Sequence, residues 1–443
     1  LSKRLVAEHE RFVHEHPRSR GLAERARGAW LQGVPMHWMV RWAGAFPIFV
    51  RQASGAHFTD VDGLTYLDLC LGDTGAMAGH SHPAVTEAVA ERLRSGVTFM
   101  LPTEDALWVG EELQRRFGLP YWQMATTATD ANRFVLRLAR RISGRPKVLV
   151  FNGCYHGTVD ETFATLAVDG AVVPRAGNLG PPVPLSETTK VVEWNDVAAL
   201  ERALAPGDVA CVLAEPALTN IGIVHPAPGF HAALREITRR AGTLLVLDET
   251  HTISAGAGGC TRAWGLEPDF FTLGKPIGGG VPTAVYGCTH VVGERIAASI
   301  ARDESDTGGI GGTLAGNALS MAAMRATLGS VLTEAAYEHT VALGERFAAG
   351  VRGVIDELDL PWNVTQLGCR VEYAFRSDAA HNGGEAAAAL DPELDRYLHL
   401  AMLNRGILMT PFHNMALIAP SATAADVDRH TALFREIVQP LVS

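Results

Sequence analysis

Two residues in the middle of the chain carry groups that could bind one small molecule covalently and ionically. Lys275 stands between an apolar run, 270–273, and a glycine cluster, 278–280. Asp248 directly follows a second apolar run, 243–247, which we expect to be a buried strand. A lysine that forms a Schiff base and an acid that pairs with a pyridinium nitrogen are the groups that a pyridoxal phosphate (PLP) site requires. Each feature alone is more typical of an ordinary loop lysine and an ordinary strand end.

Small and aromatic residues with useful chemistry stand near the start of this region. Thr127, Ala128 and Thr129 open an apolar-periodic segment, where the free N–H groups and the dipole of a helix favour a phosphate. An ordinary helix cap is the simpler interpretation of these three residues. Tyr155 follows a strand-like run and is suited either to stacking on a flat ring or to a place in the core.

An acid and a histidine complete the set of candidates. Glu215 directly follows the apolar run 209–214, and His251 lies three residues after Asp248. His251 is placed to reach the phenolic oxygen of PLP, although a lone histidine is more often a structural hydrogen-bonding residue. Because ligands bind at the carboxyl ends of parallel strands, we expect Glu215, Asp248 and Lys275 to converge.

Helical and strand-like segments alternate between about residues 83 and 325, and this alternation must position the candidates. It predicts an α/β fold with a mostly parallel central sheet and helices on both faces. The Asp62–Gly63 pair between two apolar runs predicts a hairpin, and 314–357 reads as nearly continuous helix. The expected helices lie near 84–95, 104–117, 130–142, 196–204 and 229–241, and the expected strands are 147–151, 209–214, 243–247, 270–273 and 284–287.

The pattern along the chain predicts three parts. An N-terminal segment, 1–75, holds a helix, a pocket loop and the hairpin, and joins a smaller α/β domain. A large domain, 76–325, would bind PLP, and the smaller domain is completed by residues 326–443. Residues 153–190 are rich in glycine, proline and threonine, and their length is typical of a functional loop rather than a linker.

Composition limits the partners and the location. The net charge of −10 over 443 residues disfavours nucleic acid and anionic membranes as partners. No apolar run approaches the roughly 18 residues of a membrane span, and no secretory signal pattern is present, so we expect a cytoplasmic protein. The 6 cysteines are scattered and the 17 histidines form no ligand-spaced pair on a helix face, so we predict neither disulfides nor a metal site. His80 and His82 come nearest to such a pair, and a turn before the helix that begins near Pro83 is the better interpretation.

Taken in order, these features resemble the class-III aminotransferases, which have fold type I of the PLP-dependent enzymes. The most similar branch holds glutamate-1-semialdehyde aminomutase and the β-phenylalanine and D-phenylglycine aminotransferases, and the resemblance covers roughly residues 46–435. Motifs that carry it are Asp60-Val61-Asp62-Gly63, Gly79-His80-Ser81-His82-Pro83, Tyr155-His156-Gly157, Glu215-Pro216, Asp248-Glu249, Gly274-Lys275, Gly312-Thr313-Leu314 and Asn404-Arg405-Gly406.

The resemblance implies a role for each candidate. Lys275 would be the Schiff-base lysine and proton shuttle, and Asp248 would pair with the ring nitrogen of PLP. It also implies a homodimer with shared sites, because Thr313 would reach the phosphate bound by the other subunit. Tyr155 would stack on the ring, and Thr127, Ala128 and Thr129 would hold the phosphate.

Several positions depart from the family pattern. Thr250 replaces the valine that packs on the ring, and the arginines that bind a substrate carboxylate in the β-amino-acid branch are not aligned here. Trp38 and Phe412 stand where those arginines are expected, which favours a bulky or apolar amine donor. Arg41 is offset from the expected position; if it points inward, an amino acid donor is the better interpretation.

We therefore predict an aminotransferase that moves an amino group from an amine or a non-α amino acid to a 2-keto acid such as pyruvate. The alternative is an isomerase on the same fold, an aminomutase or racemase, which needs no keto acceptor. A non-catalytic PLP-binding protein is disfavoured by the intact Lys275 and Asp248. A nicotinamide enzyme is disfavoured because no Gly-x-Gly-x-x-Gly follows the first strand.

Overall fold

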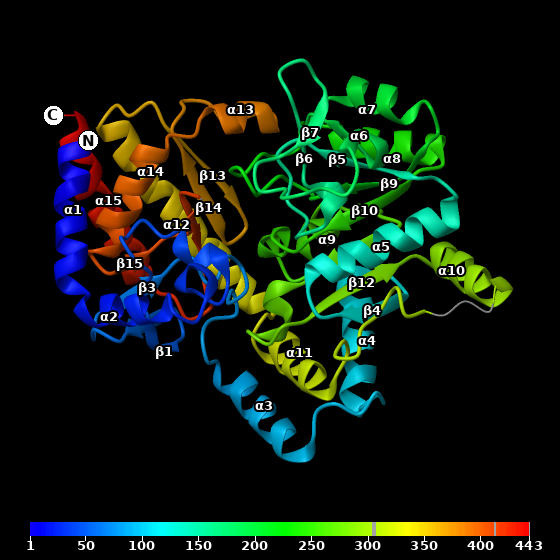
Figure 1. Cartoon of the computed structure of the whole chain (residues 1–443), viewed down its shortest axis with the longest axis horizontal. Coiled ribbons are helices and arrows are strands. Elements are labelled where there is room, and N and C mark those ends of the chain that lie inside the picture. The colour runs from blue at the N-terminus through cyan, green and yellow to red at the C-terminus, as the bar shows by residue number, and fades with distance from the viewer. Residues whose placement is uncertain (304–306, 412, 443) are drawn as a thin grey trace. The chain divides into compact units, whose positions relative to one another are not determined.

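The computed structural model describes residues 1–303, 307–411 and 413–442 and divides the chain into two compact units. The larger unit comprises Pro83–Glu334 and Ala380–Ala388 (Figure 1). The smaller unit comprises Leu1–His82, Ala335–Ala379 and Ala389–Ser443. No helix among the described residues has the length and apolar character that crossing a membrane requires.

A seven-stranded sheet in the order β4-β12-β11-β10-β9-β5-β8 forms the centre of the larger unit. The neighbours from β11 to β8 pair in parallel, whereas β12 runs antiparallel to both of its neighbours. Its inner strands are fully buried runs of branched and aromatic residues, as expected for a sheet covered on both faces. The strands are β4 (Tyr121–Ala125), β5 (Lys147–Phe151), β8 (Thr189–Val192), β9 (Val209–Ala214), β10 (Leu244–Asp248), β11 (Phe270–Leu273) and β12 (Ala284–Cys288).

Helix α5 (Ala128–Ser143) packs against β9, β11 and β12 of this sheet. Its apolar face, which includes Phe134, Val135 and Leu138, is buried in the core of the larger unit. The remaining helices of the unit are α3 (Pro83–Ser95), α4 (Glu104–Phe117), η3 (Asp160–Thr162), α6 (Leu185–Thr188), α7 (Val197–Leu204), α8 (Phe230–Ala241), η4 (Thr252–Ala255), α9 (Gly259–Ala263), η5 (Lys275–Gly278), α10 (His290–Asp303), α11 (Ala318–Ser330) and α13 (Gly383–Ala388).

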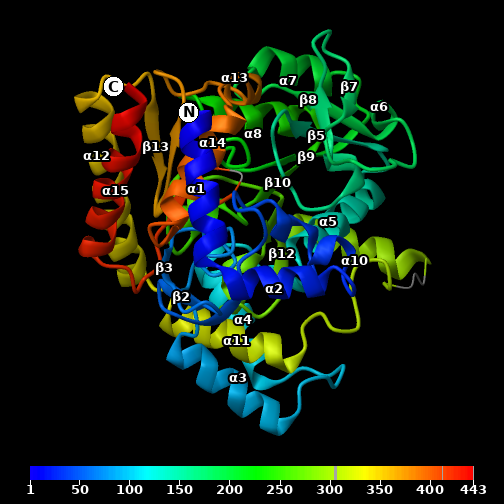
Figure 2. The ribbon, with the colours of Figure 1, turned by 60° about the vertical axis from the view of Figure 1, so that its left-hand side comes forward.

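The smaller unit contains two sheets and several long helices. One sheet has the order β1-β2-β3-β15, in which β2 and β3 form the hairpin predicted around Asp62–Gly63; the other has the order β13-β14-β16. Helix α1 lies beside α14, which also packs on α15 (Figure 2). The elements are α1 (Ser2–Glu15), α2 (Pro17–Ala26), η1 (Leu31–Gly33), η2 (His37–Val40), β1 (Val50–Ser54), β2 (His57–Asp60), β3 (Thr65–Asp68), α12 (Glu334–Glu357), β13 (Asn363–Leu367), β14 (Arg370–Ala374), α14 (Pro392–Leu403), β15 (Ile407–Leu408), β16 (Met415–Leu417) and α15 (Ala424–Val442).

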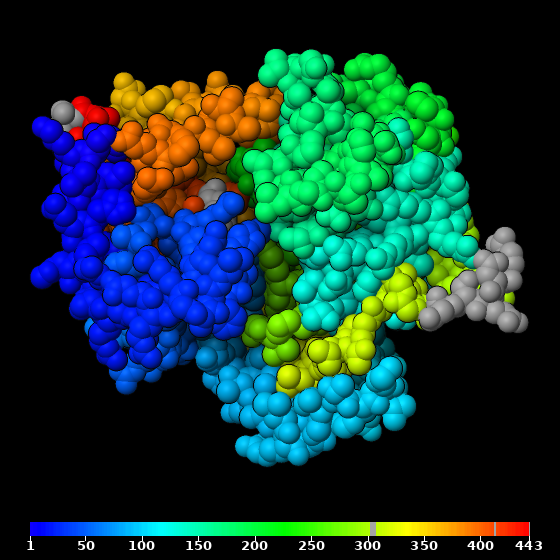
Figure 3. Space-filling view, in the orientation of Figure 1, coloured from blue at the N-terminus to red at the C-terminus, as the bar shows by residue number. Residues whose placement is uncertain are grey.

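Three features differ from the expectations drawn from the sequence. The helix expected over 314–357 is two helices, because α11 ends at Ser330 and its last turn closes with the Leu332 N–H donating to the Thr327 carbonyl (2.9 Å). Strands β4 and β8 were not expected, since β4 alternates weakly and β8 is only four residues long. The region 153–190 contains a short hairpin of β6 (Ala164–Leu166) and β7 (Val172–Pro174), which lies on the surface of the larger unit (Figure 3).

Candidate functional site

Lys275 stands at the carboxyl end of β11, where the chain turns into the short helix η5. Its backbone is left-handed, with φ of 53°, a conformation that a non-glycine residue adopts at a cost in free energy. Its Nζ lies 2.8 Å from Nε2 of His251, and both side chains are half-buried. The lysine is therefore held in one place by its backbone and by a neighbouring imidazole.

Two glycines let the backbone before Lys275 and the backbone after Tyr155 approach the start of α5 closely. A Cβ at Gly274 would lie 3.0 Å from the Cβ of Ala128, so β11 ends directly against the first turn of α5. A Cβ at Gly157, where φ is +80°, would lie 2.2 Å from the hydroxyl oxygen of Thr129. Only glycine fits at either position without a shift of the backbone or of its neighbour.

The first turn of α5 presents hydrogen-bond donors beside this close approach. Thr127 is the N-cap, and its hydroxyl oxygen accepts from the Asp130 N–H (3.2 Å). The hydroxyl of Thr129 accepts from the Thr158 N–H (3.0 Å), which ties this turn to the segment after Tyr155. The remaining N–H groups and the positive end of the helix dipole favour an anion such as a phosphate.

Asp248 is buried at the end of β10 and is surrounded by donors. Its carboxylate accepts from Asn132 Nδ2 (2.7 Å), His156 Nδ1 (3.0 Å) and the Thr250 N–H (3.0 Å). Burial alone would raise the pKa of Asp248, but the hydrogen bond and charge of His156 outweigh it and hold the pKa below its ordinary value. A negative charge is therefore fixed at this strand end at neutral pH.

His156 carries the balancing charge. Burial disfavours the imidazolium, but the neighbouring Cys154 and the Asp248 carboxylate favour it, and the pKa of His156 is raised well above its ordinary value. Asn132 holds both partners, because its Nδ2 also reaches the His156 carbonyl (3.1 Å) while its Oδ1 accepts from the Thr272 hydroxyl (2.7 Å). The three side chains form one buried polar group across α5, β10 and β11.

Glu215 follows β9 at the same edge of the sheet and is buried. The hydroxyl of Thr219 donates a hydrogen bond to its carboxyl group. Burial raises the pKa of Glu215 to about 7, against the opposing effects of the His156 charge and the Thr219 hydrogen bond. Glu215 is therefore the carboxyl group of this cluster that changes its protonation state near neutral pH.

Tyr155 lies beside two residues from the loop that follows it. Its ring meets Phe163 edge-on, with centroids 5.8 Å apart and planes at 78°. The guanidinium carbon of Arg175 lies 6.0 Å from the centroid of Tyr155 and 5.5 Å from that of Phe163. The aromatic that the sequence assigns to ring stacking is thus itself part of a packed cluster.

These residues fit PLP. The larger unit brings together a half-buried lysine, a buried carboxylate kept charged by its partners, a helix start with free donors, and an aromatic side chain. The hydroxyl of Thr250 and Nε2 of His156 are buried without a hydrogen-bond partner among the described residues, so polar atoms beside Asp248 remain for a ligand.

Of the residues predicted from the sequence, eight belong to one strand-end region of the larger unit: Thr127, Ala128, Thr129, Tyr155, Glu215, Asp248, His251 and Lys275. Thr313 is exposed on the turn before α11 and makes no hydrogen bond to these residues within the described parts of the chain. Phe412 lies outside the described residues. Trp38 and Arg41 belong to the smaller unit, at η2 and directly after it.

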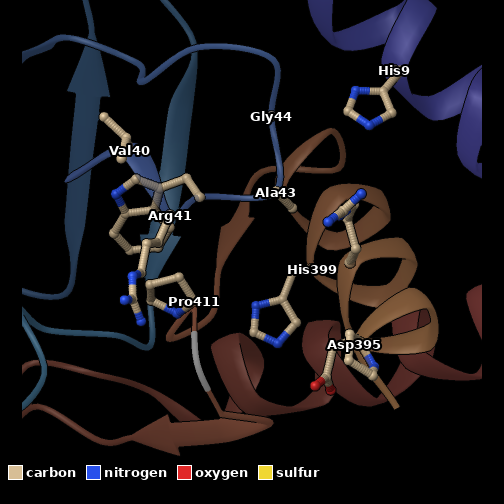
Figure 4. Close-up of a pocket in the computed structure, with 11 residues that line it drawn as sticks. His9, Val40, Arg41, Ala43, Gly44, Asp395, His399 and Pro411 are labelled. Atoms are coloured by element: carbon tan, nitrogen blue, oxygen red, sulfur yellow. The ribbon is translucent and has the colours of Figure 1, made fainter. Parts of the chain in front are cut away.

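Arg41 lines a pocket of about 650 Å³ within the smaller unit. The segment that carries Arg41 and Ala43 forms one wall, and α14, with Asp395 and His399, forms another (Figure 4). Trp42 and Arg396 also line the pocket. Trp38 is not among the lining residues. Behind this wall, Asn414 accepts from His399 Nε2 (3.2 Å) and donates to Asp395 (2.8 Å).

The sequence reading gave no role to Asn132, His156, Thr219 or Arg175, which support the predicted residues. One signal could have found Asn132, because it lies four residues before Leu136 on the apolar face of α5, and a polar residue buried there needs a partner. Arg175 lies far along an irregular loop, and nothing in the local pattern connects it to Tyr155.

Comparison with known proteins gives a consistent family. The sequence pattern described as aminotransferase class-III matches residues 38–438. A glutamate-1-semialdehyde 2,1-aminomutase of Sorangium cellulosum is 34% identical over 430 residues, which cover 95% of this chain and 96% of the relative. These names match the predicted alternative, an aminomutase, better than the predicted transfer to pyruvate.

Solved structures agree with this placement. A structure described as a glutamate-1-semialdehyde-aminomutase from Pseudomonas aeruginosa PAO1 is 54% identical, with a TM-score of 0.97 over 99% of this chain and 98% of the other. A lysine-to-alanine variant under the same name was solved in complex with PMP. A β-phenylalanine aminotransferase from Variovorax paradoxus is 26% identical, with a TM-score of 0.88 over 99% and 97% of the two chains.

Proposed function

The chain belongs to the class-III aminotransferase family of PLP-dependent enzymes, and on that premise we propose that it is an aminomutase. It would move an amino group between two carbons of one small substrate, without passing it to a separate keto acid. The observation that carries this proposal is the 34% identity, over 95% of the chain, to a protein named as a glutamate-1-semialdehyde 2,1-aminomutase. Glutamate-1-semialdehyde is therefore the first substrate to test.

Lys275 is proposed to move the proton. When bound, PLP withdraws electrons from the substrate carbon beside the transferred nitrogen, which makes that carbon acidic. Lys275 stands at a strand end with its Nζ 2.8 Å from His251, so the imidazole can orient the amine and exchange a hydrogen bond with it as its protonation changes. An isomerisation needs this proton removed at one carbon and returned at another, and one lysine within reach of both carbons can serve both steps.

Asp248 is proposed to hold the ring nitrogen of PLP, with His156 and Asn132 fixing the carboxylate. Tyr155 would lie on the ring, and the hydroxyls and N–H groups of Thr127, Ala128 and Thr129 would hold the phosphate. A carboxylate kept charged by a buried imidazolium favours a protonated ring nitrogen, which makes the electron withdrawal stronger.

Arg41 is proposed to bind a carboxylate of the substrate. Its pocket also contains Arg396, while burial raises the pKa of Asp395 to about 6, so the two guanidinium groups outnumber the one carboxylate in the lining both below and above that pH. On this proposal an amino acid is the expected substrate, rather than the apolar amine that Trp38 suggests. An Arg41→Ala variant should raise KM for the semialdehyde more than it lowers kcat.

The test is turnover of glutamate-1-semialdehyde by the PLP-loaded enzyme with no keto acid present. We expect many equivalents of the isomer with the amino group moved from carbon 2 to carbon 1, measured by mass spectrometry after chromatography. Lys275→Ala is the control and should give no turnover. Conversion that stops at about one equivalent, and resumes when pyruvate is added, would contradict the aminomutase.

That contrary outcome defines the second candidate, transamination. It is favoured by the match to the class-III aminotransferase pattern and by the similarity to a β-phenylalanine aminotransferase over 99% of the chain. A panel of amines and β-amino acids with pyruvate as acceptor would then identify the donor. Alanine formed from pyruvate is the product to measure.

We further propose a homodimer in which Thr313 reaches the phosphate held by the partner. The larger unit exposes four large apolar side chains, Phe99 (45%), Met100 (82%), Leu101 (72%) and Leu314 (58%), and a contiguous exposed apolar patch is typical of a protein–protein interface. The Ala318 N–H donates to the Val97 carbonyl (2.9 Å), so the segment with the first three residues lies beside the turn that carries Leu314. Light scattering of wild type and Met100→Asp checks the oligomeric state.

A further inference from the structure

Tyr155 lies in a short backbone segment whose flanking residues are glycines, so the segment itself restricts its backbone angles little. The segment is flanked by Gly153 and Gly157, whose φ angles are +85° and +80°. Glycine in this region is free to leave it, since it has no side chain to restrict its backbone. The position of the Tyr155 ring must therefore be fixed by contacts from outside the segment.

The inner side of the segment is held by Asn132, which donates to the His156 carbonyl (3.1 Å). The outer side is held by Arg175. Its Nη1 donates to the Cys154 carbonyl (2.6 Å), directly before Tyr155, and its guanidinium lies near the rings of Tyr155 and Phe163 (6.0 Å and 5.5 Å). The Arg175 N–H also donates to the Phe163 carbonyl (3.1 Å), which anchors the arginine itself.

From these contacts we propose that Arg175 is a positioning residue for cofactor binding, which fixes Tyr155 from the loop 159–184. Arg175 acts through Tyr155 and not on the substrate. The proposal rests on the proposed role of Tyr155 in stacking on the ring of PLP. A planar cation suits this position, because one guanidinium can donate to a carbonyl while facing aromatic rings. The loop and the cofactor site are then linked energetically by one side chain.

The experiment compares Arg175→Ala and Arg175→Lys with wild type, in the absence of substrate. The apparent Kd for PLP is measured by titration of the apoprotein, and the geometry of the bound cofactor by its visible circular dichroism. We expect Arg175→Ala to raise Kd by roughly two- to thirty-fold, the range of a cation–π contact, and to reduce the circular dichroism signal. Arg175→Lys keeps the charge but lacks the planar guanidinium, so its Kd for PLP and its circular dichroism signal should lie between those of wild type and Arg175→Ala.

Arg240→Ala is the matched control, because Arg240 lies on α8 in the same unit and, among the described residues, forms its ion pair with the exposed Glu201. A double-mutant cycle with Phe163→Leu adds a second reading: the two effects on Kd should be less than additive, since both residues hold the same ring. These measurements do not depend on which reaction the enzyme performs, so they stand if the aminomutase proposal fails.

Wild-type values of Kd and circular dichroism in Arg175→Ala would overturn the proposal. So would a normal Kd combined with a raised KM, because that result would make Arg175 a substrate-binding residue. If Arg175→Ala unfolds, which far-ultraviolet circular dichroism would reveal, the Arg175→Lys variant and the Phe163→Leu cycle on that background still decide the question.

Discussion

Each unit of the molecule contains an aspartate and a histidine that lie close together, and the pKa shifts of the two sets have opposite directions. In the larger unit, Asp248 has a lowered pKa and His156 a raised one, so both are charged at neutral pH. In the smaller unit, burial raises the pKa of Asp395 to about 6 and lowers that of His399 to about 4. The same residue types thus form an ion pair in one unit, and in the other an uncharged histidine beside a carboxyl that titrates near pH 6.

The difference lies in what stands between the partners. His156 Nδ1 touches the Asp248 carboxylate directly at 3.0 Å, so each charge compensates the desolvation of the other. Asp395 and His399 make no direct hydrogen bond to each other among the described residues and share the amide of Asn414, which satisfies hydrogen bonds but carries no charge. Burial then dominates, and each group moves toward its neutral form. Direct contact, rather than burial alone, is what allows the larger unit to keep a permanent charge at its proposed cofactor site.

The largest effect should come from breaking the ion pair. Asp248→Asn leaves the buried His156 without its counter-charge, which we expect to cost about 3–5 kcal/mol of unfolding free energy at pH 7. Activity should fall with it, because the ring nitrogen of PLP loses its partner. Urea unfolding and turnover measure the two losses, and a variant with wild-type stability at pH 7 would show that the pair is not charged.

The neutral histidine should make the protein sensitive to acid. The lowered pKa of His399 means that the unfolded state binds the proton more tightly, so stability is lost as pH falls from about 6.5 to about 4. His399→Gln keeps a donor for Asn414 and should remove up to about 3 kcal/mol of that loss. Unfolding free energies at pH 7 and pH 4.5 give the slope; an unchanged slope contradicts the assignment.

Asp395 should show the opposite dependence. Its raised pKa means that the folded state holds the proton more tightly, so stability is present below about pH 4 and is lost as pH rises to about 6. Asp395→Asn keeps the acceptor for Asn414 and should stabilise the protein by about 2–3 kcal/mol at pH 8, with little gain at pH 4. Thermal unfolding at the two pH values is the measurement, and a stabilisation that is the same at both would count against it.

The smallest effect concerns Glu215, whose pKa is raised by burial to about 7. Thr219→Val removes the hydroxyl that donates to the carboxyl group, so the pKa of Glu215 should rise further. Because the charges of His156 and Asp248 act on Glu215, we expect its ionisation to affect kcat. The change in kcat near pH 7 should then shift to higher pH by a fraction of a unit. Glu215→Gln serves as the control and should remove that change.

The main strand ends were predictable because each carries its own signal. An apolar run directly followed by Asp248 or Glu215, and another shortly before Lys275, placed three chemical groups at one edge of the sheet. The partners that set their charge were not predictable, since His156 and Asn132 are each separated from Asp248 by more than 90 residues in the sequence. Charge state is a property of such long-range contacts. For the same reason the sequence did not reveal the Asp395–Asn414–His399 set.

The left-handed backbone at Lys275 has a consequence for any inactive form of this enzyme. Replacement by alanine removes the amine but keeps the strain of a Cβ at φ of 53°, about 1–2 kcal/mol on general grounds. Replacement by glycine removes both, so the glycine variant should be the more thermostable of the two. A lysine at this position therefore carries a cost in stability, and a substrate-trapping variant with glycine here should be more stable than one with alanine.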